Sequence, residues 1–226
     1  MPDSAAPIRC GALLLAAGRG TRSGAGIPKQ YRALAGSSAL RRCLSLLAAM
    51  AEISLIQIVV HADDEKLFAD LFGDFDLPRP VFGGATRQAS VLSGLEALAP
   101  ANPELVLIHD AARPFVTREL IERGLASVKA SGAAIPAIPV TDTIKAVDAN
   151  GHVLHTPDRS TLRAVQTPQF FRFAPLLAAH RRARDAGMHD FSDDAALAEW
   201  AGLAVSTFEG EASNIKLTNP EDFQRA

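Results

Sequence analysis

The chain has 226 residues, 48% of them hydrophobic, and a formal net charge of −2. This length fits one α/β domain with a sizeable core, and the near-neutral charge excludes the broad basic face typical of general nucleic-acid binding. The two cysteines, Cys10 and Cys43, make neither a disulfide framework nor a metal pattern. The N-terminal residues lack a signal peptide, and no apolar run reaches the ~18 residues of a membrane span. We therefore expect a cytoplasmic protein without nucleic-acid or membrane partners.

Short apolar runs alternate with longer amphipathic runs along the chain, which is typical of βαβ units and a mainly parallel sheet. The runs predicted as buried strands are residues 11–16, 55–61, 105–109, 133–139 and 203–208. The runs predicted as helices are residues 39–50, 64–72, 87–98, 118–131, 174–186 and 193–201, with a short last helix from Asp222.

Residues 140–159 interrupt this alternation. Two short β-like runs, residues 143–147 and 153–155, flank the turn-forming pair Asn150-Gly151. This pattern predicts a β-hairpin that projects from the domain as an arm.

Ligands of open α/β sheets bind beyond the carboxyl ends of strands, and this rule selects three loops: residues 18–31, residues 83–90 after a further short strand, and residues 110–115. The first is the most informative: Gly18 and Gly20 follow the strand, and Lys29 comes soon after. Residues 4–51 contain seven Lys or Arg and no acidic residue. A glycine loop lets backbone N–H groups approach an anion, and unneutralised cations beside it suit a polyphosphate. The alternative is an ordinary strand–helix turn with solvated cations.

The first loop matches neither of the two commonest nucleotide motifs. A dinucleotide fingerprint requires a third glycine where Ser23 stands and an acidic residue about 20 positions later, whereas the next acidic residue is Glu52. No Gly-Lys-Ser/Thr sequence of a Walker A loop occurs in the chain. The sequence therefore predicts a phosphate-binding loop of another kind.

The other two loops and a late lysine also carry candidate site residues. Residues 83–90 could supply backbone and hydroxyl groups to a base or ribose, or form a simple turn before a helix. Asp110 ends a strand predicted to be buried on both faces, where a carboxylate beside phosphates suits Mg²⁺. Its alternatives are to cap the following turn or to pair with Arg113. Lys216 stands alone in an apolar run, and it points either into the site or to water.

Several segments, in order along the chain, together resemble the 2-C-methyl-D-erythritol 4-phosphate cytidylyltransferases of the non-mevalonate isoprenoid pathway. The segments are LAAGRGTR, PKQY, GGATRQASV, HDAARPF, PVTDTIK, TPDRSTLRAVQTPQFF, SDDAALAEW and NIKLTNPEDF. The resemblance implies a Rossmann-like nucleotidyltransferase fold, with a mainly parallel twisted sheet and a projecting β-arm. It implies a single domain over residues 1–226 that forms a homodimer through the arm at about residues 140–159.

The same resemblance implies that CTP and methylerythritol phosphate are the substrates, Mg²⁺ the cofactor and pyrophosphate the leaving group. It assigns CTP binding to Ala16, Ala17, Gly18, Gly84, Ser90 and Ala111, and the metal to Asp110. It assigns stabilisation of the transition state to Arg22 and Lys29. It assigns the acceptor phosphate to Arg113, Thr143, Arg159, Thr167 and Lys216, with Arg159 and Lys216 counted among the catalytic residues.

Two positions depart from the family's commoner pattern, and two other functions stay open. Ala85 stands where an acidic residue is frequent, and Ser192 stands where threonine is frequent. A cytidylyltransferase acting on a pentitol phosphate such as ribitol 5-phosphate would share the CTP loop. A non-catalytic nucleotide-binding domain would also share the fold. Because related chains are sometimes fused to the cyclodiphosphate synthase of the pathway, this chain could be part of such a fusion.

Overall fold

A computed structural model of the chain describes residues 9–19, 27–34 and 36–225. Within these residues, the main sheet has eight strands, in the order β10-β7-β11-β6-β1-β4-β5, with β12 also paired to β7. The strands are β1 (Cys10–Ala16), β4 (Ile53–Val60), β5 (Val81–Phe82), β6 (Leu105–Asp110), β7 (Ala133–Pro139), β10 (Arg163–Val165), β11 (Gln169–Arg172) and β12 (Ser206–Glu209). The sheet is mainly parallel, because only β10 and β11 pair antiparallel with their neighbours.

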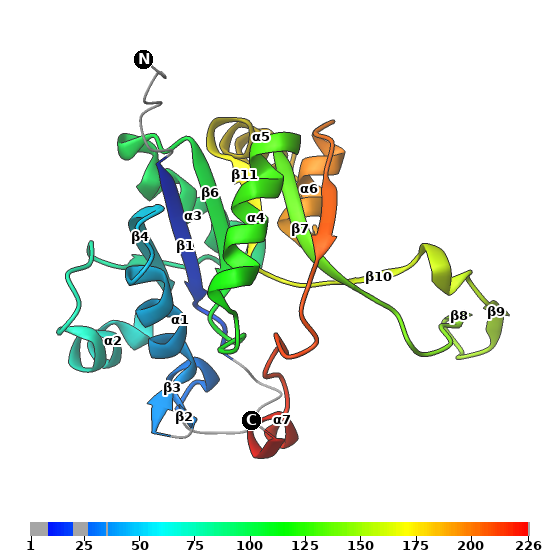
Figure 1. The fold of residues 1–226 in the computed structure, drawn as a ribbon, viewed down its shortest axis with the longest axis horizontal. Coiled ribbons are helices and arrows are strands. Elements are labelled where there is room, and N and C mark those ends of the chain that lie inside the picture. Colours follow the sequence, from blue (N-terminus) through cyan, green and yellow to red (C-terminus); the bar gives the residue numbers. More distant parts are fainter. Residues whose placement is uncertain (1–8, 20–26, 35, 226) are drawn as a thin grey trace.

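Helices cover both faces of this sheet and make a three-layer molecule (Figure 1). The core on one face includes side chains of α1 (Ala39–Ala48), α2 (Glu65–Phe72) and α4 (Arg118–Ser131). The core on the other face includes side chains of α3 (Arg87–Leu98), α5 (Phe173–Asp185) and α6 (Asp194–Trp200). The short helix α7 (Pro220–Arg225) follows near the C-terminus.

The alternation of side chains in β1 explains the two cores. Leu14 packs into the core with α1 and α4, whereas its neighbour Leu13 packs into the core with α3, as the period of two in a strand requires. Two glycines let helices approach the sheet closely: a Cβ at Gly94 would overlap Leu13, and one at Gly124 would overlap the ring of Phe170. The central strands are therefore buried on both faces.

Threonine side chains cap the N-termini of α3 and α4, the two helices whose predicted bounds match the structure. Thr86 accepts a hydrogen bond from the backbone of Ala89 at the start of α3, and Thr117 accepts one from Leu120 at the start of α4. Such side-chain caps satisfy N–H groups that lack partners in the first turn. Both helices have the predicted bounds.

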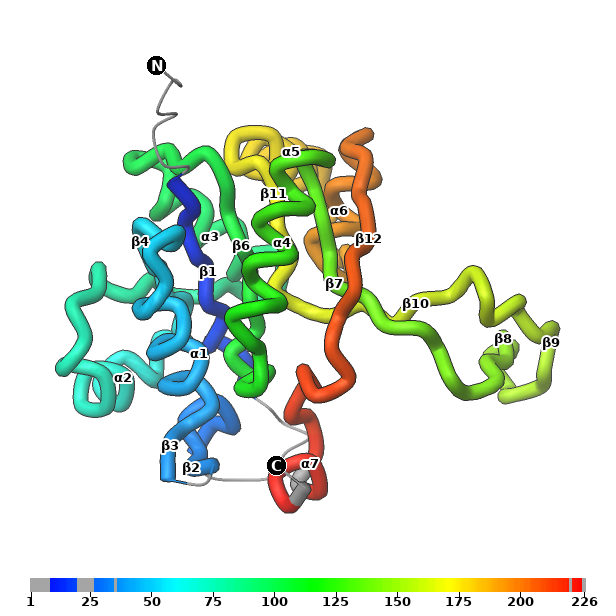
Figure 2. Tube along the Cα trace, in the orientation of Figure 1, coloured from blue at the N-terminus to red at the C-terminus, as the bar shows by residue number. Residues whose placement is uncertain are grey.

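The predicted arm is present as a separate two-stranded hairpin, β8 (Ala146–Val147) and β9 (Val153–His155). Gly151 adopts a φ of 85° in its turn, a conformation that glycine reaches without steric cost. Figure 2 shows the arm reaching away from the three layers. Its apolar side chains are open to solvent: Val147, Val153 and Leu154 are 53%, 59% and 65% exposed.

The remaining predictions differ from the structure in detail. The last strand begins at Ser206 rather than at residue 203, and the strand predicted from residue 55 begins at Ile53. The antiparallel strands β10 and β11 were not predicted. Both cysteines are buried and free. In the part of the chain that is described, no helix combines the length and apolar character needed to cross a bilayer. The short elements are β2 (Ala33–Leu34), β3 (Ser37–Ser38), η2 (Lys29–Tyr31), η3 (Ala62–Asp64), η4 (Ala99–Ala101) and η5 (Arg159–Thr161).

Candidate functional site

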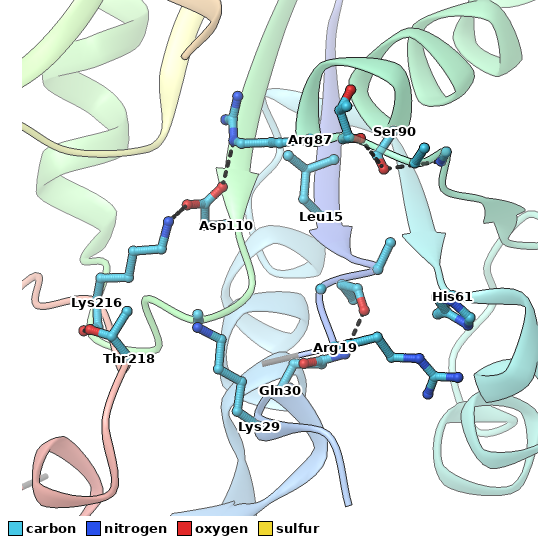
Figure 3. Close-up of a pocket in the computed structure, with 17 residues that line it drawn as sticks. Leu15, Arg19, Lys29, Gln30, His61, Arg87, Ser90, Asp110, Lys216 and Thr218 are labelled. Carbon is cyan, nitrogen blue, oxygen red and sulfur yellow. Dashed lines mark hydrogen bonds and ion pairs between the residues drawn. The ribbon is translucent and has the colours of Figure 1, made fainter. Parts of the chain in front are cut away.

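A pocket of about 570 Å³ lies beyond the carboxyl ends of β1, β4 and β6, at the edge where open α/β sheets bind ligands. It is lined by the loops after β1, β4, β5 and β6, by the start of α3 and by the segment after β12 (Figure 3). Eight of the predicted site residues lie in its wall: Ala16, Ala17, Gly18, Lys29, Gly84, Ser90, Asp110 and Lys216.

The first loop is anchored at its root by a buried glutamine. The side-chain amide of Gln30, which is 2% exposed, donates a hydrogen bond to the carbonyl of Ala16 at 2.6 Å. This contact places Lys29 at the pocket, where its Nζ donates to the carbonyl of Leu217 at 3.0 Å. Lys29 is therefore held beside the segment that carries Lys216.

The first loop also contains two arginines, Arg19 and Arg22. Arg19 lines the pocket but pairs with two carboxylates, Asp63 and, at 3.1 Å, Asp64. Its charge is thereby balanced within the protein. Arg22 lies outside the described residues, so its predicted role stays a prediction.

The glycine loop before α3 packs directly on the first loop. The backbone N–H of Gly84 donates to Ser90 Oγ at 3.1 Å, and this hydroxyl donates to the carbonyl of Thr86 at 2.9 Å. At Gly83, a Cβ would lie 2.5 Å from the Cβ of Ala17 and 2.7 Å from Ser90 Oγ. Only a residue without a side chain allows the two loops to meet this closely.

Asp110 is the buried acid of the site. Every residue of β6 is buried, and the Asp110 carboxylate contacts Lys216 Nζ at 2.6 Å and Arg87 Nε at 3.4 Å (Figure 3). Burial alone would raise the pKa of Asp110, but the cations Arg87 and Lys216 outweigh it and hold the pKa well below its usual range. The carboxylate is therefore ionised, and it pairs with these two cations rather than with Arg113.

Lys216 is directed into the site by the residue that follows it. Leu217 is fully buried, and its N–H donates to the carbonyl of Ala112 at 2.8 Å. This anchor ties the late segment to the loop after β6. The Lys216 side chain, 40% exposed, consequently reaches Asp110 across the pocket.

Three predicted residues lie near the pocket without lining it. Ala111 is completely buried next to Asp110. Thr167 is buried, and its hydroxyl accepts from the backbone N–H of Asp110 at 3.1 Å and contacts His109 Nδ1 at 3.0 Å. Arg113 donates to the carbonyl of Asn214 at 2.7 Å. In this structure these contacts hold the walls of the pocket together.

Thr143 and Arg159 lie on the arm, and the structure does not bring them to the pocket of their own chain. Both are exposed, and Arg159 Nη1 donates to the carbonyl of Thr141 at 3.0 Å. The arm projects away from the body that contains Asp110 and Lys216 (Figure 1).

The residues at Asp110 fit a magnesium ion that is shared with phosphates. Among the described residues, no group of three His, Cys, Asp or Glu side chains forms a metal cage. Mg²⁺ usually takes one or two protein carboxylates and completes its shell with water and substrate phosphates. A single ionised carboxylate at the edge of a cationic pocket meets that requirement. Asp110 would be the protein ligand.

Sequence reasoning assigned no role to Arg87, a charged residue of the pocket wall. Arg87 lines the pocket and contacts both Asp110 and the buried Asp194, the latter at 2.8 Å. Its pair with Asp194 joins residues far apart in the sequence, so no local pattern indicates it. His61 and Thr218 also line the pocket and were not predicted.

Comparison with known proteins gives one consistent family. A sequence model of the 2-C-methyl-D-erythritol 4-phosphate cytidylyltransferase family matches residues 10–226. The bifunctional enzyme IspD/IspF of Rhodopseudomonas palustris (strain HaA2) is 57% identical over 219 residues, which cover 97% of this chain and 55% of that enzyme. The chain thus spans about half the length of the curated relatives it matches.

Solved structures agree with this result over almost the whole chain. The 4-diphosphocytidyl-2C-methyl-D-erythritol synthase of Anaerococcus prevotii has a TM-score of 0.85 at 32% identity, covering 97% of this chain and 94% of that one. The 2-C-methyl-D-erythritol 4-phosphate cytidylyltransferase of Thermus thermophilus has a TM-score of 0.74 at 36% identity, covering 95% of each chain. The fold expected from the sequence is confirmed.

Proposed function

The chain belongs to the 2-C-methyl-D-erythritol 4-phosphate cytidylyltransferase family, and on that premise we propose that it transfers a cytidylyl group from CTP to 2-C-methyl-D-erythritol 4-phosphate. The products are 4-diphosphocytidyl-2-C-methyl-D-erythritol and pyrophosphate, and the step belongs to isoprenoid precursor biosynthesis. One observation supports the site: Lys29, Asp110 and Lys216, which are distant in sequence, meet in one pocket with the two glycine loops.

The reaction needs charge stabilisation more than it needs a protein nucleophile. A phosphate oxygen of the acceptor attacks the α-phosphorus of CTP in line, and the bond from that phosphorus to the oxygen bridging to the β-phosphate breaks. Pyrophosphate leaves with the bonding electrons. Two anions must be brought together, and fixed cations offset the negative charge that develops at phosphorus.

The described residues suit these tasks. Ala16, Ala17 and Gly18 line the pocket and are proposed to bind the nucleotide, while Gly84 and Ser90 are proposed to bind cytosine and ribose. Ala111, predicted to bind CTP as well, is fully buried beside Asp110. Lys29 is proposed to stabilise the transition state, and Arg22, which lies outside the described residues, is proposed to act with it. Lys216 binds the acceptor phosphate, supported by Arg113 and Thr167.

Asp110 is proposed to hold Mg²⁺ together with the phosphates of CTP. A divalent cation held by Asp110 would supply positive charge that offsets the charge of the phosphates. Lys216 and Arg87 contact the same carboxylate. These cations therefore compensate the buried charge of Asp110 before the metal binds.

The arm is proposed to complete the acceptor site of a second subunit. Its exposed apolar residues Val153 and Leu154 would be covered in a homodimer, because contiguous exposed apolar surface marks interaction sites. Thr143 and Arg159 would then bind the acceptor phosphate in the partner's pocket. The single-domain boundary and the cytoplasmic location stay predictions.

A pyrophosphate-release assay tests the activity and its alternatives. Turnover is expected only with CTP and methylerythritol phosphate together. Equal turnover with ribitol 5-phosphate would contradict the proposed acceptor. CTP binding without turnover on either acceptor would contradict an enzymatic role.

A mixing experiment tests the arm. In a heterodimer of Arg159→Ala and Lys29→Ala chains, one of the two sites has both native residues and the other has neither. If subunits exchange freely, two inactive variants should recover roughly a quarter of native turnover on mixing. Recovery requires that the arm serve the partner's site. No recovery in a mixture shown to contain heterodimers would refute that arrangement.

A further inference from the structure

A line of alternating charges runs from the pocket into the helical layer behind it. Lys216 Nζ lies 2.6 Å from Asp110, and Asp110 lies 3.4 Å from Arg87 Nε. Arg87 Nη1 lies 2.8 Å from Asp194 Oδ2, and Asp194 Oδ1 lies 3.2 Å from His180 Nε2. Asp194 and His180 are each 1% exposed. The family's expected site accounts for Asp110 and Lys216 and leaves the inner part of this line without a role.

Asp194 is held in a fixed position relative to the strand that carries Asp110. It is the first residue of α6, whose N-terminus is capped by Asp193. The side chain of Gln169 donates to Asp193 at 2.8 Å and accepts from the backbone of Ala195 at 3.2 Å. Gln169 belongs to β11, which pairs with β6. The position of Asp194 is thus set by the sheet itself.

Arg87 is shared unequally between two carboxylates. It lies 2.8 Å from Asp194 and 3.4 Å from Asp110. A fully buried carboxylate is stable only when it is paired, so Asp194 retains the guanidinium. Free of Asp194, the planar guanidinium could present two parallel N–H groups to Asp110, the geometry in which arginine binds carboxylates most strongly.

We infer that Asp194 is a positioning residue, which holds the guanidinium of Arg87 back and so keeps the Asp110 carboxylate able to bind a divalent cation with CTP. This inference rests on the proposed role of Asp110 as the metal ligand. It assigns Asp194 no contact with substrate. Its effect passes through Arg87 alone.

Asp194→Asn tests the inference, with Mn²⁺ as the probe. Loss of the restraining charge should weaken Mn²⁺ binding in the presence of CTP roughly tenfold, the scale of one competing charge-assisted hydrogen bond. Binding is measured by electron paramagnetic resonance of free Mn²⁺. In turnover, the half-saturating metal concentration should rise, while kcat at saturating metal should change less than about threefold. A purely structural defect would lower kcat at every metal concentration.

Glu96→Gln is the matched control. It removes the surface ion pair of Glu96 with Arg181, 2.6 Å long, which joins α3, the helix of Arg87, to α5, the helix of His180. Mn²⁺ binding and turnover should equal those of the native protein. Thermal melting verifies that each variant is folded.

The double variant Arg87→Met with Asp194→Asn separates positioning from packing. It removes the guanidinium and its buried partner together, so no unpaired buried charge remains and the chain should fold even if Asp194→Asn alone does not. Without Arg87, nothing competes for Asp110 from that side. The Mn²⁺ affinity of the double variant should therefore return to within about threefold of native. If Asp194→Asn acts by damaging the structure, the second substitution should instead lower the affinity below that of Asp194→Asn alone.

The outcomes distinguish this inference from the proposed function. If Asp110→Asn leaves Mn²⁺ binding unchanged, the proposed metal ligand is wrong. If Asp110→Asn weakens Mn²⁺ binding but folded Asp194→Asn binds it as the native protein does, the inference is overturned and the proposed function stands. A double variant that binds Mn²⁺ at least tenfold more weakly than native also overturns the inference.

Discussion

Gly83→Ala should damage both the stability of the fold and the affinity for CTP. The added Cβ would lie 2.5 Å from the Cβ of Ala17 and 2.7 Å from Ser90 Oγ. Carbon atoms in ordinary contact are about 3.5–4.0 Å apart, so the first loop must retreat by roughly 1 Å. Gly83 cannot retreat freely instead, because its N–H donates to the carbonyl of Val60 at 2.8 Å.

The magnitude follows from that displacement. Forcing one extra methyl group into packed structure costs about 1–3 kcal/mol. In a protein of this size, such a loss lowers the melting temperature by roughly 2–12 °C. A displacement of about 1 Å in a positioning element can cost on the order of 10²-fold in turnover, and Ala17 and Ser90 both line the pocket.

Two measurements on Gly83→Ala and on a contrasting variant, Gly18→Ala, test this prediction. Melting is followed by circular dichroism, and CTP affinity by isothermal titration calorimetry. At Gly18, which also lines the pocket, an added Cβ would meet no atom of the described residues within 4 Å, so Gly18→Ala should melt within about 1 °C of native. If Gly83→Ala also melts within about 1 °C of native and binds CTP with native affinity, then the prediction is refuted, because Gly83 is not needed for the close packing of the two loops.

Three further predictions concern packing, protonation and charge. Gly124→Ala should destabilise the fold by about 1–3 kcal/mol in thermal melts, because the new Cβ would overlap the fully buried ring of Phe170; an unchanged melting temperature would contradict this. Burial lowers the pKa of His109 to about 4 from 6.5, so between these values only the unfolded chain binds the proton. The contribution of neutral His109 to the free energy of unfolding is therefore complete above pH 6.5. It is lost as the pH falls toward 4, by about 3 kcal/mol in total. Denaturant titrations of His109→Gln at several pH values should lack this part of the pH dependence of the free energy of unfolding. In steady-state assays, Arg19→Ala should lower kcat less than about tenfold, because its charge is balanced by Asp63 and Asp64, whereas Lys29→Ala should lower it at least ~10²-fold, because Lys29 is proposed to stabilise the transition state; equal losses would refute that distinction.

The sequence predicted those elements best whose boundaries are encoded locally. Helices α3 and α4 begin where predicted because Thr86 and Thr117 cap their N-termini. The antiparallel strand β11 was missed because Gln169–Arg172 is only four residues long and directly follows Pro168. Its pairing with β6 and β7 depends on tertiary contacts, which no local pattern reports.

The candidate site shows the same division. The glycine loop, Asp110 and Lys216 could be identified because each follows a predicted strand or interrupts an apolar run. The partners of Asp110 could not be identified, since Arg87 and Lys216 approach it from 23 and 106 residues away in sequence. The pairing of Arg19 with Asp63 and Asp64 could not be predicted either, because these carboxylates lie 44 and 45 residues further along the chain.

The central position of β1 has a consequence for synthesis of the chain. β1 lies between β4 and β6 in the sheet, so one edge of this apolar strand has no partner until residue 110 has left the ribosome. Non-local strand pairing is slow, and open strand edges attract other chains. The parallel topology that gathers distant loops at one pocket therefore leaves the nascent chain with an aggregation-prone edge, for which we expect chaperone binding during translation.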